Sequence, residues 1–394
     1  MKKIDMFILY LSLIIVMMGF SLAMPVLPFY IESLGGRGVH YGLLIACYGV
    51  MQLIFAPLWG SLSDKHGRKP FLLIGLIGLG MAMSLFGLAN KLWMLYAAQM
   101  LSGSLSSATL PAAQAYVGDS TTGDERGGAM GKIGGAIGLG IVIGPGIGGL
   151  LASRSLAAPF FIASGLCLLT FVIILVKLPE SLSEESRSEN VDIKFMQIMG
   201  LWQALFTPIG FGLVVAFMAI FGQTIFSSVF GLYAIGRFSY GPEQVGTIFM
   251  AMGLMYALAQ GLLVGPITKR FGEQKVISSA LLGTAVGFAL ILLANTFLTI
   301  LAAVSCFILL NSLLKPSALA FVSKKTVGNQ GKAMGITESY MSLGRIIGPL
   351  WGGMFFDINL YYPFLSGILL LLIMFIATVS RVKIDKNPEL KSNH

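Results

Sequence analysis

The stretch that decides the fold is Gly140–Gly149, Gly-Ile-Val-Ile-Gly-Pro-Gly-Ile-Gly-Gly, which lies inside strongly apolar sequence. A similar stretch, Gly-Arg-Ile-Ile-Gly-Pro-Leu-Trp-Gly-Gly, occupies Gly344–Gly353, 204 positions later. Both stretches fit the pattern GxxxGPxxGG, which chance would rarely produce twice in one chain. The repeat therefore indicates a duplicated membrane protein.

Composition places the chain in a lipid bilayer. Of its 394 residues, 56% are hydrophobic and only 11% are charged, which is too apolar for an ordinary soluble domain. A helix crosses the hydrocarbon layer with about 20 apolar residues. The runs that qualify are 6–31, 41–62, 71–90, 92–117, 129–152, 157–178, 204–234, 244–267, 275–295, 297–322, 332–356 and 361–380. We therefore expect an all-α integral membrane protein with twelve transmembrane helices.

The positions of the basic residues support this count. With the N-terminus inside, twenty of the 26 Lys and Arg residues fall in inside segments and four in outside loops, while Lys315 and Arg345 lie within spans. This distribution agrees with the positive-inside rule and places both termini in the cytoplasm. It tests the count independently, because one missed or invented helix would reverse the side of every later loop.

The duplication extends through the whole chain. Pro111 and Pro316 match at a spacing of 205 positions, and Gly131 and Gly335 match at 204. A polar segment rich in Ser, Glu and Arg separates the sixth run from the seventh and is the only one long enough for a linker. We predict two pseudo-symmetric six-helix halves, with the N-terminal half at 1–178, a cytoplasmic linker at 179–200 and the C-terminal half at 201–394.

A compact charged loop follows the second run. In Gly60-Ser-Leu-Ser-Asp-Lys-His-Gly-Arg-Lys, the charged residues Asp64, Arg68 and Lys69 lie close to Gly60 and Gly67. Glycines permit a tight reversal. A carboxylate there could cap a helix of the other half and release it on rearrangement, so these five residues are candidate gating residues. The alternative is a topogenic loop with ordinary positive charges.

The second half has its own version of this loop, in which Lys269 replaces Asp64 and Glu273 replaces Arg68. The repeated glycine pattern suggests close helix packing, because small residues four apart let backbones approach. We predict that its two helices each pack against the opposite half and help to seal a cavity. The gating residues expected there are Gly140, Gly144, Pro145, Gly148, Gly149, Gly344, Gly348 and Pro349.

These residues resemble the major facilitator superfamily, and within it the twelve-helix drug:proton antiporter family of bacterial tetracycline and multidrug efflux transporters. The loop from Gly60 and the stretch Gly140–Gly149 carry most of the resemblance, with Met24–Pro28, Ala115–Asp119 and Asp124–Arg126 adding to it. The resemblance implies a multi-pass protein of a bacterial plasma membrane. It also implies a central cavity between the halves, opened to each side in turn by rocking.

Three ionisable residues lie within predicted spans, where each costs about 2.5 to 3.5 kcal/mol. Glu338 and Arg345 are seven positions apart and hence on one helix face, roughly 10 Å apart along the axis. We expect Glu338 to exchange the proton, with its pKa set by competition between burial and attraction to Lys315 or Arg345. The alternative is a structural ion pair. Two cations against one acid favour a neutral, zwitterionic or anionic substrate over a purely cationic dye.

The expected substrate cavity combines polar and apolar side chains. Where related antiporters usually carry an Arg, this chain has Gln99. The 21 methionines suit a deformable pocket, although Met is also common on lipid-facing surfaces. The predicted substrate-binding residues are Gln99, Gln223, Phe226, Phe230, Asn311, Lys315 and Glu338.

Several other chemistries find no support in the sequence. No GxxxxGK[ST] motif is present, so no ATP motor is expected, and the three Cys and three His residues form no metal or catalytic pattern. The basic residues form no nucleic-acid-binding patch. We therefore predict no enzyme activity, cofactor or metal. The expected partners are a small-molecule substrate, protons and the lipid bilayer, and nothing in the sequence requires more than a monomer.

The favoured function is secondary active export of small lipophilic compounds, as in antibiotic or multidrug efflux, by alternating access in exchange for protons. An alternative is export of a native metabolite or lipid, with incidental drug transport. More distant alternatives are a membrane enzyme or a transporter-like sensor. An enzyme would need a His, Asp or Cys cluster at one membrane face, and a sensor would usually need an added signalling domain.

Overall fold

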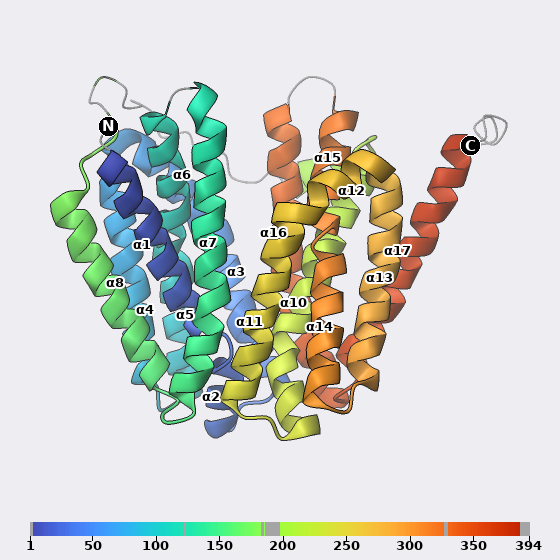
Figure 1. The fold of residues 1–394 in the computed structure, drawn as a ribbon, viewed down its shortest axis with the longest axis horizontal. Helices are drawn as coiled ribbons and strands as arrows, with labels where there is room; N and C mark the ends of the chain where they lie inside the picture. The colour runs from blue at the N-terminus through green and yellow to red at the C-terminus, as the bar shows by residue number, and fades with distance from the viewer. Residues whose placement is uncertain (1–2, 122, 183–184, 186–197, 327–329, 387–394) are drawn as a thin grey trace. The chain divides into compact units, whose positions relative to one another are not determined.

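The computed structural model describes residues 3–121, 123–182, 185, 198–326 and 330–386, which form helices joined by short turns (Figure 1). The chain divides into two compact units. Unit 1 contains Met1–Phe195 and Ser239–Gly253, and unit 2 contains Met196–Phe238 and Leu254–His394. Within the predicted linker, residues 183–184 and 186–197 lie outside the described residues. The predicted domain boundaries therefore stay a prediction.

Unit 1 is built from helices that pack in pairs. Helix α1 packs on α7 and α8, while α4 packs on α5 and α8. The bounds are α1 Lys3–Leu22, α2 Leu27–Ser33, α3 Gly38–His66, α4 Lys69–Gly87, α5 Leu92–Leu105, the 3₁₀ turn η1 Ser106–Ala108, α6 Thr109–Ser120, α7 Gly123–Ala152, α8 Ala158–Lys177 and the first part of α11, Pro242–Leu258.

Unit 2 repeats this pairing. Helix α10 packs on α16, as α1 packs on α7, and α13 packs on α14 and α17, as α4 packs on α5 and α8. The bounds are α9 Ile198–Leu205, α10 Gly210–Phe238, the end of α11, the π-helical turn η3 Ala259–Leu263, α12 Val264–Phe271, α13 Glu273–Leu293, α14 Phe297–Asn311, α15 Leu314–Lys325, α16 Gln330–Ile358 and α17 Tyr362–Lys386.

Among the described residues, ten helical segments are long and apolar enough to cross a membrane. The two remaining predicted spans, 92–117 and 332–356, are also helical. They correspond to the α5–η1–α6 segment and to α16, which carries Glu338 and Arg345 within its predicted span. The count of twelve spans and the cytoplasmic location of the termini therefore remain predictions.

Prolines explain two differences from the predicted boundaries. The seventh span was expected from residue 204, but α10 begins at Gly210 after a break at Phe206–Ile209. Pro208 lies in that break, and proline has no backbone N–H to continue a helix. The first span is likewise divided between α1 and α2, where Pro25 lies in the intervening turn. These breaks shift helix ends without changing the order of the elements.

Candidate functional site

Arg68 is the centre of a charged cluster at the turn between α3 and α4. Its guanidinium donates to Asp119 Oδ2 at 2.9 Å, to Ser63 Oγ at 3.0 Å and to a carboxylate oxygen of Asp64. Burial opposes the positive charge, but the hydrogen bonds and attraction of Asp119 and Asp64 outweigh that effect and raise the pKa of Arg68. The turn itself depends on Gly67, whose φ of 101° favours glycine.

Glu180 joins this cluster from the start of the predicted linker. Its carboxylate accepts the backbone N–H of Arg68 at 2.7 Å and that of Lys69 at 3.1 Å, so it caps the start of α4. The Tyr116 hydroxyl donates to the carbonyl of Pro179 at 2.9 Å and holds the same segment. Sequence reasoning assigned Glu180 to the linker alone. The only sequence feature that could have suggested a role for Glu180 at the membrane surface was its position just after the end of a predicted span.

Two further predicted gating residues lie at the edge of this cluster. Lys69 Nζ donates to the carbonyl of Leu175 at 2.8 Å, so its ammonium lies over the end of α8. Gly60 has open space where a side chain would begin. Lys69 therefore caps the C-terminal end of α8, and a gating role for Lys69 and Gly60 stays a proposal.

Unit 2 contains the corresponding ion pair with the charges exchanged. Lys324 Nζ, at the end of α15, lies 2.6 Å from Glu273 Oε1, at the start of α13. Glu273 lies 205 positions after Arg68, and Lys324 lies 205 positions after Asp119. The sequence comparison identified the first exchange but missed the second, although the same spacing would have revealed it.

The first copy of the glycine pattern packs mainly within its own half. Gly140, Gly144 and Gly148 face the α1 backbone, and a Cβ at Gly144 would lie 2.8 Å from the Met18 carbonyl oxygen. The Ser21 hydroxyl also donates to the Gly140 carbonyl at 2.9 Å. These glycines let α7 approach α1 closely. For Gly140, Gly144 and Gly148, the expected packing against the opposite half was therefore wrong.

Another part of the same pattern meets α11. A Cβ at Gly149 would lie 3.1 Å from the Cα of Gly246, and one at Gly246 would lie 2.5 Å from the Pro145 carbonyl oxygen. The two helices therefore touch backbone to backbone at this point. Although Gly246 follows the predicted linker in sequence, it belongs to unit 1 together with Gly149, so this contact lies within one unit.

The second copy also packs within its own half. A Cβ at Gly344 would lie 2.8 Å from the Phe217 carbonyl oxygen, and one at Gly348 would lie 2.9 Å from that of Phe221. The Thr224 hydroxyl of α10 donates to the Gly344 carbonyl at 3.1 Å, which repeats the hydroxyl-to-carbonyl bond of the first copy. Pro349 lies inside α16, as Pro145 lies inside α7. The expectation that Gly344 and Gly348 pack against the opposite half was therefore also wrong.

The charged residues of α16 form an ion pair along one face. Arg345 Nη2 lies 3.3 Å from Glu338 Oε1, and Arg345 Nη1 lies 3.5 Å from Ser342 Oγ. The Glu338 side chain is 57% exposed and that of Arg345 30% exposed, so both remain accessible on unit 2. Lys315, on α15, has no hydrogen bond or ion pair with any described residue. Of the two cations that the sequence offered as partners of Glu338, Arg345 is the one that forms the ion pair in this structure.

The other predicted substrate-binding residues differ in accessibility. Phe226 and Phe230 are fully buried, stack on each other at 4.7 Å and belong to the aromatic core of unit 2. This burial does not suit a ligand-binding surface, so we leave both out of the proposed site. Asn311 is also buried and donates to the Ala219 carbonyl of α10 at 3.2 Å, which makes it a helix-packing contact. Gln223 is partly accessible, whereas Gln99 is buried.

Two helical units with equivalent helix pairs and ion pairs at equivalent turns, built largely from helices that could cross a membrane, indicate a membrane protein built by duplication. Residues 9–241 and 212–393 match the family model of the Major Facilitator Superfamily. The chain belongs to this superfamily, as its sequence motifs predicted.

Relatives and solved structures agree with this assignment. The chain is 33% identical over 369 residues to Multidrug resistance protein 2 of Bacillus subtilis (strain 168), covering 92% of each chain. It is 28% identical over 378 residues to Quinolone resistance protein NorA of Staphylococcus aureus (strain COL), covering 94% of this chain and 96% of that one. It also matches the fold of a mutant form of the nucleoside transporter NupG with a TM-score of 0.82 at 14% identity, covering 95% and 99% of the two chains. The chain is a multi-pass plasma-membrane protein of bacterial type.

Proposed function

We propose that this protein exports small lipophilic compounds, antibiotics among them, from the bacterial cytoplasm in exchange for protons. The observation that carries this proposal is the 33% identity, over 92% of both chains, to a protein named for multidrug resistance. Alternating access of a site between two six-helix halves is the mechanism typical of the superfamily. The gating role belongs, in this proposal, to the Arg68 cluster and its charge-exchanged counterpart in unit 2.

Glu338 is the residue that we assign to proton coupling. It is an acid within a predicted span, and its ion pair with Arg345 gives the carboxylate a positive partner at 3.3 Å. Uptake of a proton by Glu338 would release Arg345, and loss of the proton would restore the pair. The direction of transport then depends on the side of the membrane from which the proton arrives.

Lys315 is the cation that we assign to substrate recognition. Because Arg345 is paired with Glu338 and Lys315 has no partner among the described residues, its ammonium is available to an acceptor group. A lipophilic compound with a carboxylate or another strong acceptor satisfies that charge. This preference agrees with the neutral, zwitterionic or anionic substrate class expected from the sequence.

The proposal is tested in two stages. Cells that express the protein should accumulate less of a quinolone or a lipophilic dye, and a protonophore should remove the difference. In vesicles with an imposed proton gradient, Glu338→Gln should abolish gradient-driven uptake, while Glu125→Gln, which changes an exposed acid of α7, should transport normally. Unchanged accumulation across a broad compound panel would instead favour export of a native metabolite or lipid. Gradient-driven transport by Glu338→Gln would remove its coupling role.

A further inference from the structure

The π-helical turn η3, Ala259–Leu263, marks a point where the two copies of the duplicated structure differ. The corresponding helix of unit 1, α3, is α-helical throughout. Before the turn, Gly49 matches Gly253 at a spacing of 204 positions, whereas after it Gly60 matches Gly265 at 205. Unit 2 therefore has one extra residue between these points. A π turn is the usual way in which a helix accommodates such a residue, and it often lies at a functional site.

The π turn carries a polar side chain, Gln260. One added residue rotates the helix face by about 100°, so the turn changes the direction in which this side chain points. The positions of unit 1 that match it, at spacings of 205 and 204, are Phe55 and Ala56. Lys315 likewise matches Leu110 at 205. Unit 2 thus has an amide and an ammonium where unit 1 has only apolar side chains.

Gln260 donates to a carbonyl that a proline leaves without its helical partner. Helix α14 ends at Asn311, and α15 begins at Leu314. Pro316 has no backbone N–H, so the carbonyl of Ser312, four residues earlier, lacks its usual donor. Gln260 Nε2 donates to this carbonyl at 3.1 Å. An unsatisfied carbonyl within a bilayer costs several kcal/mol, so this bond completes the joint between α14 and α15.

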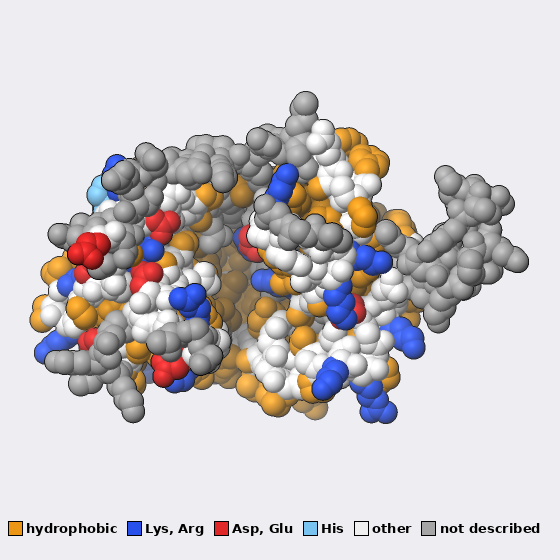
Figure 2. All heavy atoms as spheres, turned by 90° about the horizontal axis from the view of Figure 1, so that it is seen from above, with side chains coloured by type: hydrophobic (Ala, Val, Ile, Leu, Met, Phe, Trp, Pro, Cys, Tyr) orange, Lys and Arg blue, Asp and Glu red, His pale blue; other side chains and the backbone are white. Residues whose placement is uncertain are grey.

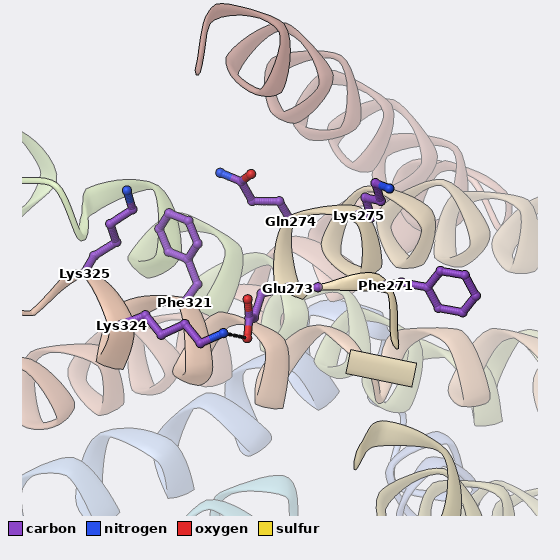
Figure 3. A pocket seen from close by; sticks show the side chains of 8 residues that line it. Phe271, Glu273, Gln274, Lys275, Phe321, Lys324 and Lys325 are labelled. Atoms are coloured by element: carbon purple, nitrogen blue, oxygen red, sulfur yellow. Dashed lines mark ion pairs between the residues drawn. The ribbon is translucent and has the colours of Figure 1, made fainter. Parts of the chain in front are cut away.

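Other helices fix the remaining contacts of α14 and α15. Asn311, at the same joint, donates to the Ala219 carbonyl of α10 at 3.2 Å. At the far end of α15, Lys324 pairs with Glu273 of α13 at 2.6 Å (Figure 3). Gln260 provides the hydrogen bond from α11. The start of α15 is therefore held from both α10 and α11.

Lys315 lies at this held start of α15. Figure 2 shows basic side chains gathered at the surface of the end of unit 2 where α15 finishes. Lys315 lies nine residues before Lys324, about 14 Å along the helix axis, so it does not belong to that surface. We propose that Gln260 is a positioning residue, which holds Lys315 where its ammonium recognises an anionic group of the substrate. This inference rests on the proposed function, which assigns substrate recognition to Lys315.

Gln260→Met tests this role, because it removes the amide with little change in side-chain size. In vesicles with an imposed proton gradient, the KM for norfloxacin, which has a carboxylate, should rise about tenfold, equivalent to about 1.4 kcal/mol or one hydrogen bond. The KM for ethidium, a cation without a carboxylate, should stay unchanged. In a Lys315→Met background, Gln260→Met should have no further effect on norfloxacin. The control is Gln203→Met, which removes an exposed amide of α9.

A second measurement does not need transport. In a variant whose three native cysteines are replaced by Ser, Lys315→Cys provides a single thiol at this position. Adding Gln260→Met should change the rate at which a maleimide labels this thiol by about threefold or more, because a joint that loses a hydrogen bond opens more often. Adding Gln203→Met should leave the rate unchanged.

Several results would overturn the positioning role. They are an equal rise in both KM values, an undiminished effect of Gln260→Met without Lys315, transport of ethidium but not norfloxacin, and an unchanged labelling rate. A Gln260→Met protein that no longer folds would show a purely structural residue. If the unmodified protein transports neither compound, the proposed function fails, and the labelling rate alone decides whether Gln260 positions residue 315.

Discussion

Replacement of Gly144 by Ala is the sharpest test of how the repeated glycine pattern works. The new Cβ would lie 2.8 Å from the Met18 carbonyl oxygen and 3.1 Å from the Leu22 backbone nitrogen. These are backbone atoms of α1, so they cannot rotate away. The methyl group would also collide with the Ser21 hydroxyl, which donates to the Gly140 carbonyl. Helix α7 would therefore have to move away from α1.

The expected cost combines two effects. Overpacking in a close contact costs about 1 to 3 kcal/mol, and loss of the Ser21 hydrogen bond costs about 1 kcal/mol. Their sum of about 3 kcal/mol, less about 1 kcal/mol because Ala favours a helix over Gly, should lower the apparent Tm of the purified protein by about 2 to 4 °C. Gly138→Ala is the matched control, because it lies in the same helix and a Cβ there meets no atom within 4 Å.

The control should be neutral or slightly stabilising, since Ala favours a helix over Gly by about 1 kcal/mol. The measurement is thermal unfolding in detergent, together with the amount of protein inserted in membranes. Transport in vesicles should fall more for Gly144→Ala than for Gly138→Ala. Equal melting temperatures for the two variants would refute the close-packing account of the glycine pattern.

Other predictions concern the charged cluster and the buried amide. Arg68→Asp should lower stability by about 3 kcal/mol because it leaves acids facing one another, and adding Asp119→Arg should restore part of the loss; no recovery in thermal unfolding would contradict the pairing. Glu180→Gln weakens a charged helix cap and should cost about 1 kcal/mol, measured in the same assay, whereas Glu125→Gln should cost nothing measurable. Asn311→Ala should cost about 1 to 3 kcal/mol, because it removes a buried hydrogen bond to Ala219; an unchanged Tm would show that the bond contributes nothing.

The sequence predicted local features well and orientations poorly. Apolar runs and basic loops located the helices because hydrophobic length and charge placement follow directly from the bilayer. The GxxxG spacing correctly indicated close helix packing. It could not identify the partner, because a small residue shows that something approaches but not which helix does. For Gly144 the partner is α1 of the same half, rather than a helix of the other half.

The candidate site shows the same limit. Glu338 and Arg345 were predicted on one face because helical periodicity fixes that relation, and they form an ion pair at 3.3 Å. Phe226 and Phe230 were expected to face a cavity, yet they are buried among other aromatic rings of unit 2. Hydrophobicity alone does not distinguish a ligand-facing aromatic from one in the core. Glu180 was missed because its partners lie more than a hundred positions away.

The division of α11 between the two units has a consequence for how this chain can be cut. Its first part, within Ser239–Gly253, belongs to unit 1 and contacts the α7 backbone at Gly149, although it follows the linker in sequence. A fragment that ends at residue 195 would lack this strip and leave Gly149 of α7 without its contact to α11. Two fragments cut in the linker should therefore reconstitute a folded protein only when they are produced together, each completing the other.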